Sequence, residues 1–487
     1  MRNCFLIVLA VMLLSGSPLD GQTLPFDPEI RSCYLNLDTV KGNRLLKQKY
    51  SPDEPEFIRI LGYREFLHNL LFQSKSNADR FLAQSGTWLK KLEKSGAVNG
   101  LVTAAIAEVH LYRAVIASQF SEYKASATEL LAAYRVVAKS GTEFSISDRN
   151  KLSGILGVLF QQVPEKYGKY LRLLGVRPSG LSGFNGLERY YSASLPGSIE
   201  RMEGYVLLIT AYKEFSKDPA TAWNFVKSEG APMLENQLVR YQSALAALKA
   251  GDCESAVNLL KPESNLDIKP PFSYWNYQLG RCKLYRNDTD AISYLEQFIE
   301  NPGGENYRHS AALFACWYYV LHGNQDKAKA FTLGMKDFPS PLSGYDREAM
   351  NEISSGQLPD PEVLKVRMRF DGGYFEECLA GCDHLIKSGR FSYGKVGELL
   401  YRKARCEQRL GRTSLAVGSF LGVLERADSV RSYIVPNSAL QLGYLYKKTG
   451  QLELARKYFK TSMDLNKYGF RDGINRQAQV ALEELEK

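Results

Sequence analysis

The stretch ALQLGYLYKKTGQLELARKYFKTS, residues 439–462, decides how this chain is expected to fold. Gly450 can end a first helix because glycine accepts a positive φ. Early in the next helix, the small Ala455 allows close approach to the first helix. Phe459, four residues later, lies on the same face and fills the space beneath a neighbour. The stretch therefore predicts two antiparallel helices joined by a tight turn.

Weaker copies of this pattern precede it in the same order: a turn residue, a small residue, then a large one. Aligned on Ala455, the small positions fall at Ala256, Ala291, Ala328, Cys378 and Ala416, with spacings of 35, 37, 50, 38 and 39 residues. One such helix pair cannot bury its apolar stripe alone, so consecutive pairs are expected to stack. The expected fold class is all-α, an α-solenoid of stacked antiparallel helix pairs.

These units resemble the tetratricopeptide repeat. Its consensus places Leu-Gly, Tyr, Gly, Ala and Phe at the offsets of Leu442-Gly443, Tyr446, Gly450, Ala455 and Phe459. The resemblance covers roughly residues 235–487, and it implies a superhelix whose concave face is lined by the first helix of each pair.

The domain organisation follows from where the repeats begin. Residues 231–487 are expected to form the solenoid, with a Pro/Gly/Ser-rich insertion around 339–361. Residues 22–230 are expected to be helical but irregular, as degenerate hairpins of the same kind. The order of motifs in 154–190, and the C-terminal Ala481-Leu482-Glu483-Glu484-Leu485, resemble the inclusion-body-clearance / outer-membrane tetratricopeptide family. That family is intracellular and lacks a signal peptide, which argues against transferring its role.

The N-terminus, MRNCFLIVLAVMLLSGSPLDGQ, predicts export. Its apolar run from Phe5 to Leu14 is too short to span a bilayer and suits a signal peptide at residues 1–21; a buried first helix is the alternative. Ser17 stands where a lipoprotein signal would carry cysteine, so no lipid anchor is expected. No later segment has 18 uninterrupted apolar residues, so no membrane span is expected. The predicted location is periplasmic or secreted.

The net charge of +9 does not indicate nucleic-acid binding, because Lys and Arg are spread along the chain and mixed with acids. Catalytic and cofactor motifs are also missing. The five His include no His-Glu-x-x-His, and the sequence has no phosphate-binding Gly-x4-Gly-Lys-Ser/Thr and no Gly-x-Ser-x-Gly. We therefore expect a protein that is not an enzyme and has no catalytic residue, cofactor or metal.

Seven cysteines remain after the signal peptide: Cys33, Cys253, Cys282, Cys316, Cys378, Cys382 and Cys406. An odd number leaves at least one thiol unpaired in the monomer. Cys378 and Cys382 share a helix face, but both fall on packing positions of the repeat. Packing is the expected role, and a disulfide or a metal or redox site is the alternative.

The concave face is the predicted functional site, because the resemblance places first-helix residues there. Tyr, Trp and Arg supply much of the energy in protein interfaces, and Arg can grip a carboxylate with two hydrogen bonds. The alternative is that many of these side chains only cover the superhelix. The expected peptide-binding groove consists of Tyr241, Tyr277, Arg281, Trp317, Arg367, Tyr401, Arg402, Arg405, Tyr444 and Lys447.

The sequence thus predicts an exported scaffold or adaptor that binds a protein or peptide and belongs to a bacterial envelope complex. Association with a membrane-bound complex is compatible with this role. The alternative is a helical binder of glycans or other small ligands, in which Trp317, Trp275 and neighbouring Tyr stack on sugar rings.

Overall fold

The computed structural model describes residues 27–95, 100–140, 143–161, 168–216, 218–261, 272–353, 356–430, 432–465 and 471–486. Within these ranges the chain forms 25 α-helices, α2 to α26, and no β-strand. The expected all-α fold class is confirmed. The signal peptide predicted at residues 1–21 lies outside the described residues.

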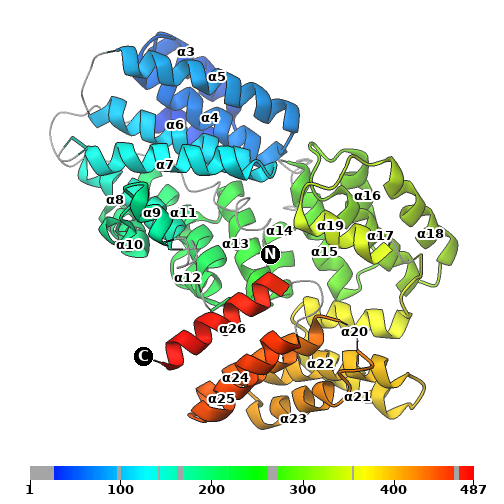
Figure 1. Ribbon diagram of the computed structural model, residues 1–487. Helices are drawn as coiled ribbons and strands as arrows, with labels where there is room; N and C mark the ends of the chain where they lie inside the picture. Colours follow the sequence, from blue (N-terminus) through cyan, green and yellow to red (C-terminus); the bar gives the residue numbers. More distant parts are fainter. Residues whose placement is uncertain are drawn as a thin grey trace.

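The N-terminal half is a block of helices in which α3 to α7 lie together at one end of the molecule (Figure 1). Its helices are α2 (Pro28–Leu35), α3 (Thr39–Lys49), α4 (Pro55–Phe72), α5 (Lys75–Lys94), α6 (Gly100–Gln119), α7 (Tyr123–Lys139), α8 (Ile146–Phe160), α9 (Gly168–Leu173), α10 (Gly183–Ala193), α11 (Ile199–Phe215) and α12 (Thr221–Glu229), with the short 3-10 helices η3 (Pro178–Gly180) and η4 (Ala231–Met233).

The second half is a series of helix hairpins, as the repeat pattern predicted. The hairpins pair α13 (Gln237–Ala250) with α14 (Cys253–Leu260), α15 (Ser273–Arg286) with α16 (Ala291–Glu300), α17 (Arg308–Leu321) with α18 (Gln325–Gly334), α20 (Pro361–Asp371) with α21 (Phe375–Lys387), α22 (Tyr393–Arg409) with α23 (Thr413–Leu424), and α24 (Ile434–Lys448) with α25 (Leu452–Asp464). The 3-10 helix η5 (Met335–Asp337) follows α18, and α26 (Arg471–Leu485) packs on α24 and α25. The expected solenoid of antiparallel helix pairs is confirmed.

The predicted repeat register is also confirmed. All six small positions, at Ala256, Ala291, Ala328, Cys378, Ala416 and Ala455, are 0% exposed. In the last hairpin, a Cβ atom on Gly443 would meet the Phe459 ring at 2.5 Å, so only glycine leaves room for that ring. The hairpin turns have a left-handed residue where the pattern required one: Gly251, Gly323, Gly373, Gly411 and Gly450, and Asn287 in the second hairpin.

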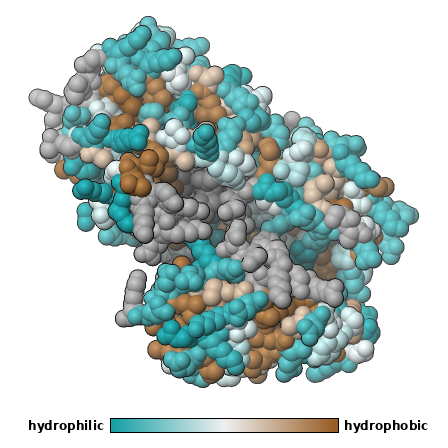
Figure 2. Space-filling view, in the orientation of Figure 1, coloured by the Kyte–Doolittle hydropathy of each residue, from teal (hydrophilic) through white to brown (hydrophobic). Residues whose placement is uncertain are grey.

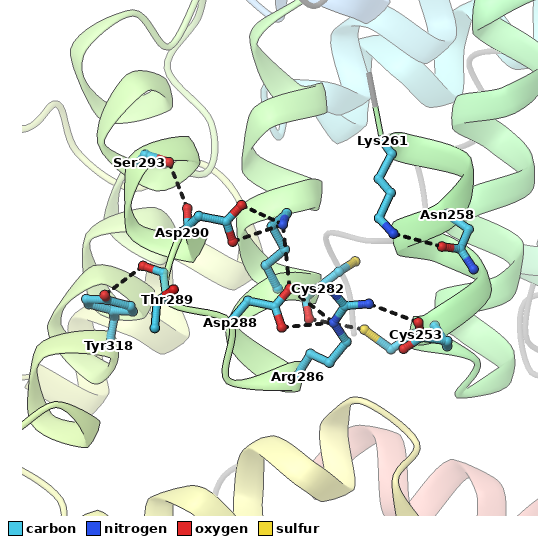
Figure 3. A network of polar contacts seen from close by, with 12 residues as sticks. Cys253, Asn258, Lys261, Cys282, Arg286, Asp288, Thr289, Asp290, Ser293 and Tyr318 are labelled. Atoms are coloured by element: carbon cyan, nitrogen blue, oxygen red, sulfur yellow. Dashed lines mark hydrogen bonds and ion pairs between the residues drawn. The ribbon is translucent and has the colours of Figure 1, made fainter. Parts of the chain in front are cut away.

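Polar contacts hold successive hairpins in register at these turns (Figure 3). In the α15–α16 turn, Nε of Arg286 donates to Asp288, and its Nη1 donates to Glu254 of the preceding hairpin at 2.9 Å. On the other side, the Tyr318 hydroxyl of α17 donates to the Thr289 carbonyl at 2.8 Å. One turn therefore binds both neighbouring hairpins.

The two halves share an apolar core. A continuous cluster of buried side chains extends from Ile30 in α2 to Ala246 in α13. At the same junction, Nδ2 of Asn236 donates to the Leu35 carbonyl at 3.2 Å and to Oδ1 of Asn36 at 2.8 Å. Among the described residues, α6 is the one helix long and apolar enough to cross a membrane, and it is mostly buried inside this core.

The insertion between α18 and α20 contains a further helix, α19 (Gly344–Ile353). Its Asp346 is 0% exposed and accepts hydrogen bonds from the backbone N–H of Tyr307 at 2.7 Å and of Ser310 at 3.0 Å. The Ser343 hydroxyl donates to the same carboxylate at 2.6 Å. The insertion thereby caps the N-terminus of α17, whose first N–H groups have no partner within the helix.

The next helix, α20, returns across the first hairpins and packs against α15 and α17. At its end, the α20–α21 turn meets the α13–α14 turn. A Cβ atom on Gly373 would lie 1.6 Å from the Gly251 carbonyl oxygen, and Nη2 of Arg409 donates to the Ala250 carbonyl at 2.5 Å. The fourth hairpin, through Gly373, and the fifth, through Arg409 of α22, therefore both touch the first.

Apolar residues gather over the α22–α25 block on the face shown in Figure 2, whereas hydrophilic residues cover most of the α3–α7 block. The exposed large apolar side chains of α23 and α25 are Leu415, Leu452 and Leu454. Isolated exposed leucines are ordinary on protein surfaces.

Candidate binding surface

The ten side chains predicted to line the groove occupy three different environments. Four rings are buried: Tyr241 is 8%, Tyr277 0%, Trp317 2% and Tyr401 7% exposed. These rings pack inside the protein rather than line an open surface.

The buried rings have partners of their own. Tyr241 packs edge-on against Phe272, with ring centroids 4.7 Å apart. The Tyr277 hydroxyl lies 2.9 Å from the Ser310 hydroxyl, and the Tyr401 hydroxyl accepts a hydrogen bond from Asn437 at 2.7 Å. The resemblance placed these rings on the correct helices but could not show which neighbours would cover them.

Helix α20 covers Trp317. The guanidinium carbon of Arg367 lies 4.3 Å from the Trp317 ring centroid, a cation–π contact. The same guanidinium donates to Glu352 of α19 at 2.7 Å. Two predicted groove residues thus contact each other, and the chain's own α20 packs against α15 and α17 where a partner was expected.

The last two predicted residues, Tyr444 and Lys447 on α24, lie against the chain's end. Nζ of Lys447 forms an ion pair of 2.7 Å with Glu484 of α26. The Tyr444 ring is 5.2 Å from that of Phe459 in α25. The structure does not bring these two residues together with the arginines of α15, α20 and α22.

What the structure does bring together is a cluster of charged residues from three helices. Arg281 of α15, Arg367 of α20 and Arg402 of α22 surround Asp371 of α20, and Arg405 follows Arg402 by one turn of α22. We call these five residues the inner surface. Burial raises the pKa of Asp371, while Arg367, Arg402 and Arg281 act to lower it. One carboxylate therefore lies in the field of three arginines that are far apart in the sequence.

The arginines of the inner surface differ in how they are neutralised. Arg367 lies 3.8 Å from Asp371 in addition to its contact with Glu352. Arg281, Arg402 and Arg405 form no ion pair within the described part of the chain. Arg281 lies 5.8 Å from the Tyr277 centroid and 6.0 Å from that of Tyr285, so aromatic rings are among its contacts.

Two of these guanidinium groups also carry an unpaired buried donor. Nε of Arg281 and Nε of Arg405 are buried and have no hydrogen-bond partner. A buried donor without a hydrogen bond lowers the stability of the fold. On the same helix face, Arg405 acts with burial to lower the pKa of Arg409, which indicates crowding of positive charge.

Sequence reasoning missed Asp371 and Tyr433. Asp371 follows Arg367 by one helical turn, a spacing that signals an i,i+4 pair. Tyr433 lies just before α24 and is 39% exposed, with its ring centroid 6.4 Å from that of Tyr401. Its closeness to the inner surface could not be read from the sequence, because it depends on how α22 and α24 pack.

In the described residues, no group of three or more His, Cys, Asp or Glu side chains is arranged to hold a metal ion. The chemistry available at the inner surface is binding of anionic groups by guanidinium, together with packing against exposed tyrosine.

Comparison with known proteins gives no family. No family model matches the chain, and no curated protein matches it. Among solved structures, the APC/C hetero-tetramer Cut9–Hcn1 is similar at 12% identity over 94% of this chain and 95% of that chain, with a TM-score of 0.25. The human IFIT1 dimer with PPP-AAAA is similar at 15% identity over 91% and 95%, with a TM-score of 0.27. A monomeric mutant of IFIT1 with m7Gppp-AAAA is similar at 15% identity, with a TM-score of 0.26. These TM-scores lie below the level at which a likeness carries an argument, so the solenoid rests on the helix hairpins of this chain.

Proposed function

We propose that this protein is an exported scaffold that binds a protein or peptide partner in a bacterial envelope complex, and that the partner contacts the inner surface through carboxylates. The observation that carries the proposal is the absence of any ion pair at Arg281, Arg402 and Arg405 within the described residues.

The contrast with the molecule's other enclosed cations supports this reading. Arg31 is buried against Glu200 and Glu203, and Arg59 against Glu108 and Asp148. The fold thus supplies acids where charges are needed for its own stability. Within the described residues no acid forms an ion pair with Arg402 or Arg405, although Asp371 lies in the field of Arg402. The two arginines lie one helical turn apart and can hold carboxylates of a partner in two-point hydrogen bonds.

The glycan alternative loses support from the same structure. Trp275 is 6% exposed and Trp317 is 2% exposed. Trp275 also donates its indole N–H to the Leu260 carbonyl at 2.9 Å. A sugar ring could not stack on either indole without displacing α20 or the neighbouring hairpin. We therefore favour a protein or peptide, and we assign no catalytic step to the protein.

The test is capture of a partner by the variant R402E/R405E. Purified wild-type and variant proteins are immobilised and exposed to envelope extract of the source cell, and bound proteins are identified by mass spectrometry. We expect the partner retained by the wild type to be lost from the variant, because the variant replaces two guanidinium groups with carboxylates that repel its acids. Retention should also weaken as salt rises.

The matched control is K448E/K460E. Both lysines are exposed, lie on α24 and α25, and form no ion pair in the described residues, so the control has the same change in net charge away from the inner surface. Circular dichroism establishes that both variants are folded. Equal capture by the wild type and by R402E/R405E would contradict the proposal, as would equal loss in the control.

A further inference from the structure

The seven cysteines of the described residues are all buried, but they are not equivalent. Cys33 and Cys316 have no cysteine beside them; the pKa of the Cys316 thiol is raised to about 11 by burial and by Glu352, with no contribution from another thiol. The remaining five gather at two places, each between one hairpin and the next.

The first place lies between α14 and α15, where Cys253 faces Cys282 (Figure 3). Sγ of Cys253 is 3.3 Å from the Cys282 carbonyl oxygen, to which it donates. The two side chains are 1% and 0% exposed. Both side chains belong to the same buried cluster, and the Cys282 thiol, followed by burial, raises the pKa of Cys253.

The second place lies between α21 and α22, where Cys378 has two neighbours, Cys382 and Cys406. All three are 0% exposed and belong to one buried cluster between the packed helices α21 and α22. The Cys382 thiol acts to lower the pKa of Cys378, but the Cys406 thiol and burial raise it overall. Cys378 and Cys382 are four residues apart on one helix, where Cβ atoms are about 5–6 Å apart. A disulfide needs about 3.5–4.5 Å. This requirement disfavours Cys382 and leaves Cys406, on the helix packed against α21, as the partner of Cys378.

The two places are related by the repeat. In each, the first cysteine belongs to the second helix of a hairpin and the second cysteine belongs to the first helix of the next. The separation is 29 residues for Cys253 and Cys282, and 28 for Cys378 and Cys406. In each, the second cysteine directly follows an arginine of the inner surface, Arg281 or Arg405 in turn.

We propose that Cys253 forms a disulfide with Cys282 and that Cys378 forms one with Cys406, so that two covalent bonds join consecutive hairpins. Cys33, Cys316 and Cys382 stay as free thiols. The bonds fix α15 and α22, the helices that carry Arg281 and Arg405, against the hairpins that precede them. The inference concerns the solenoid's construction and does not depend on the proposed partner.

The oxidant is a disulfide, either that of a thiol oxidoreductase in the export compartment or oxidised glutathione. A thiolate of the pair attacks one oxidant sulfur, which forms a mixed disulfide and releases one oxidant thiol. The second cysteine then attacks the protein sulfur of that mixed disulfide, which forms the protein S–S bond and releases the second oxidant thiol. Two electrons pass to the oxidant, and the two thiol protons end on its two sulfurs.

The reaction belongs to folding rather than to the finished protein. Once the hairpins pack, these thiols are hidden, and the thiolate of Cys253 or Cys378 is disfavoured. The oxidant must therefore meet the cysteines before α15 and α22 close over them.

The test is disulfide mapping of the full chain refolded from its reduced, denatured state in oxidised and reduced glutathione. Free thiols are blocked with iodoacetamide, and unreduced peptides are identified by mass spectrometry. We expect peptides linking Cys253 to Cys282 and Cys378 to Cys406, with Cys33, Cys316 and Cys382 alkylated. Complete alkylation of either pair, or a link through Cys33, Cys316 or Cys382, would overturn the proposal.

A stability measurement shows whether the bonds join the hairpins. The Tm of the oxidised wild type should exceed that of the reduced protein by about 5 °C. This difference should vanish in C282A/C406A and persist in C316A, which removes an equally buried cysteine without a thiol neighbour. An equal Tm for oxidised and reduced wild type would refute the joining role, and the mapping remains decisive if C282A/C406A fails to fold.

Discussion

The N-terminal block contains fully buried charges that hold one another. Arg59 of α4 donates to Glu108 of α6 at 2.7 and 3.0 Å and to Asp148 of α8 at 2.8 Å, and Lys151 of α8 also binds Glu108. Removing one member of such a group is costly, because the others remain buried with uncompensated charge. No sequence pattern singles out these residues, since each stands in an ordinary helix and its partners lie on other helices.

Replacing Glu108 with Gln should destabilise the protein by about 3 kcal/mol or more. Gln keeps the shape of the side chain but leaves Arg59 and Lys151 without their shared carboxylate. Urea denaturation at neutral pH measures the change. E93Q on the exposed face of α5 is the control, because Glu93 forms no ion pair in the described residues; a loss as small as in that control would refute the role of Glu108.

The lowered pKa of Glu108 predicts that the protein loses stability in acid. Burial acts to raise the pKa of Glu108, but Arg59 and Lys151 outweigh it and lower the pKa from 4.5 to about 2. Because the pKa of Glu108 is lower in the folded than in the unfolded protein, ionised Glu108 stabilises the fold. This stabilisation is complete at pH values above the unfolded-state pKa, and it disappears as the pH falls toward the folded-state pKa. Stability measured from about pH 5 to about pH 3 should therefore fall more steeply in the wild type than in E108Q.

At the scale of helices, the insertion between α18 and α20 changes the solenoid most. Its Pro, Gly and Ser content predicted a break in the repeat, and the structure has α19 there, with Asp346 as the cap of α17. The cap joins residues that are 36 and 39 positions apart. Composition can indicate where a repeat is interrupted, but not that the interruption returns to a neighbouring helix end.

Replacing Asp346 with Ala should destabilise the protein by about 2–3 kcal/mol, because three donors lose a buried carboxylate acceptor. Urea denaturation measures this loss. Limited proteolysis should also show faster cutting within 339–361 as α19 detaches. D337A is the control, since Asp337 is exposed and forms no hydrogen bond or ion pair in the described residues. Unchanged cutting and stability in D346A would show that α19 is held by other contacts.

The position of each hairpin turn and of its packing residues could be predicted from the sequence. Ala455, Gly450 and Phe459 are local signals, because helix termination and close helix approach depend on residues a few positions apart. The inner surface was predictable only in part. Arg281, Arg367 and Arg402 do lie on first helices, but Trp317 is covered by Arg367 of α20, which follows it by 50 residues. Such tertiary coverage leaves no mark on local periodicity.

For the whole molecule, the decisive contact is between the α13–α14 and α20–α21 turns. Gly251 and Gly373 both have positive φ, at 82° and 84°. They lie so close that Gly373 has no room for a side chain, because its Cβ would overlap the Gly251 carbonyl. The backbone N–H of Cys253 also reaches the Gly372 carbonyl at 3.4 Å. An ordinary solenoid lacks this contact, since each of its units touches only its neighbours.

Replacing Gly373 with Ala should weaken this contact. G411A is the matched control. Gly411 has a φ of 75° and nothing within 4 Å of its added Cβ, so this variant measures the cost of alanine at positive φ without any steric overlap. We expect G411A to cost about 1 kcal/mol and G373A about 2 kcal/mol more, from overpacking. Chemical denaturation measures both; equal losses would mean that the two turns separate without cost.

The contact between these turns also bears on how the molecule comes apart. A chain of hairpins that touch only in sequence can fray from either end, and partly unfolded forms then accumulate. Here the segment between Gly251 and Gly373 closes into a loop without a covalent bond, so none of its hairpins is a free end. Closing a loop of this length must await a rare encounter between distant parts of the chain, so folding should be slow. Once closed, the loop should melt as a single cooperative unit, while α24 to α26 fray first.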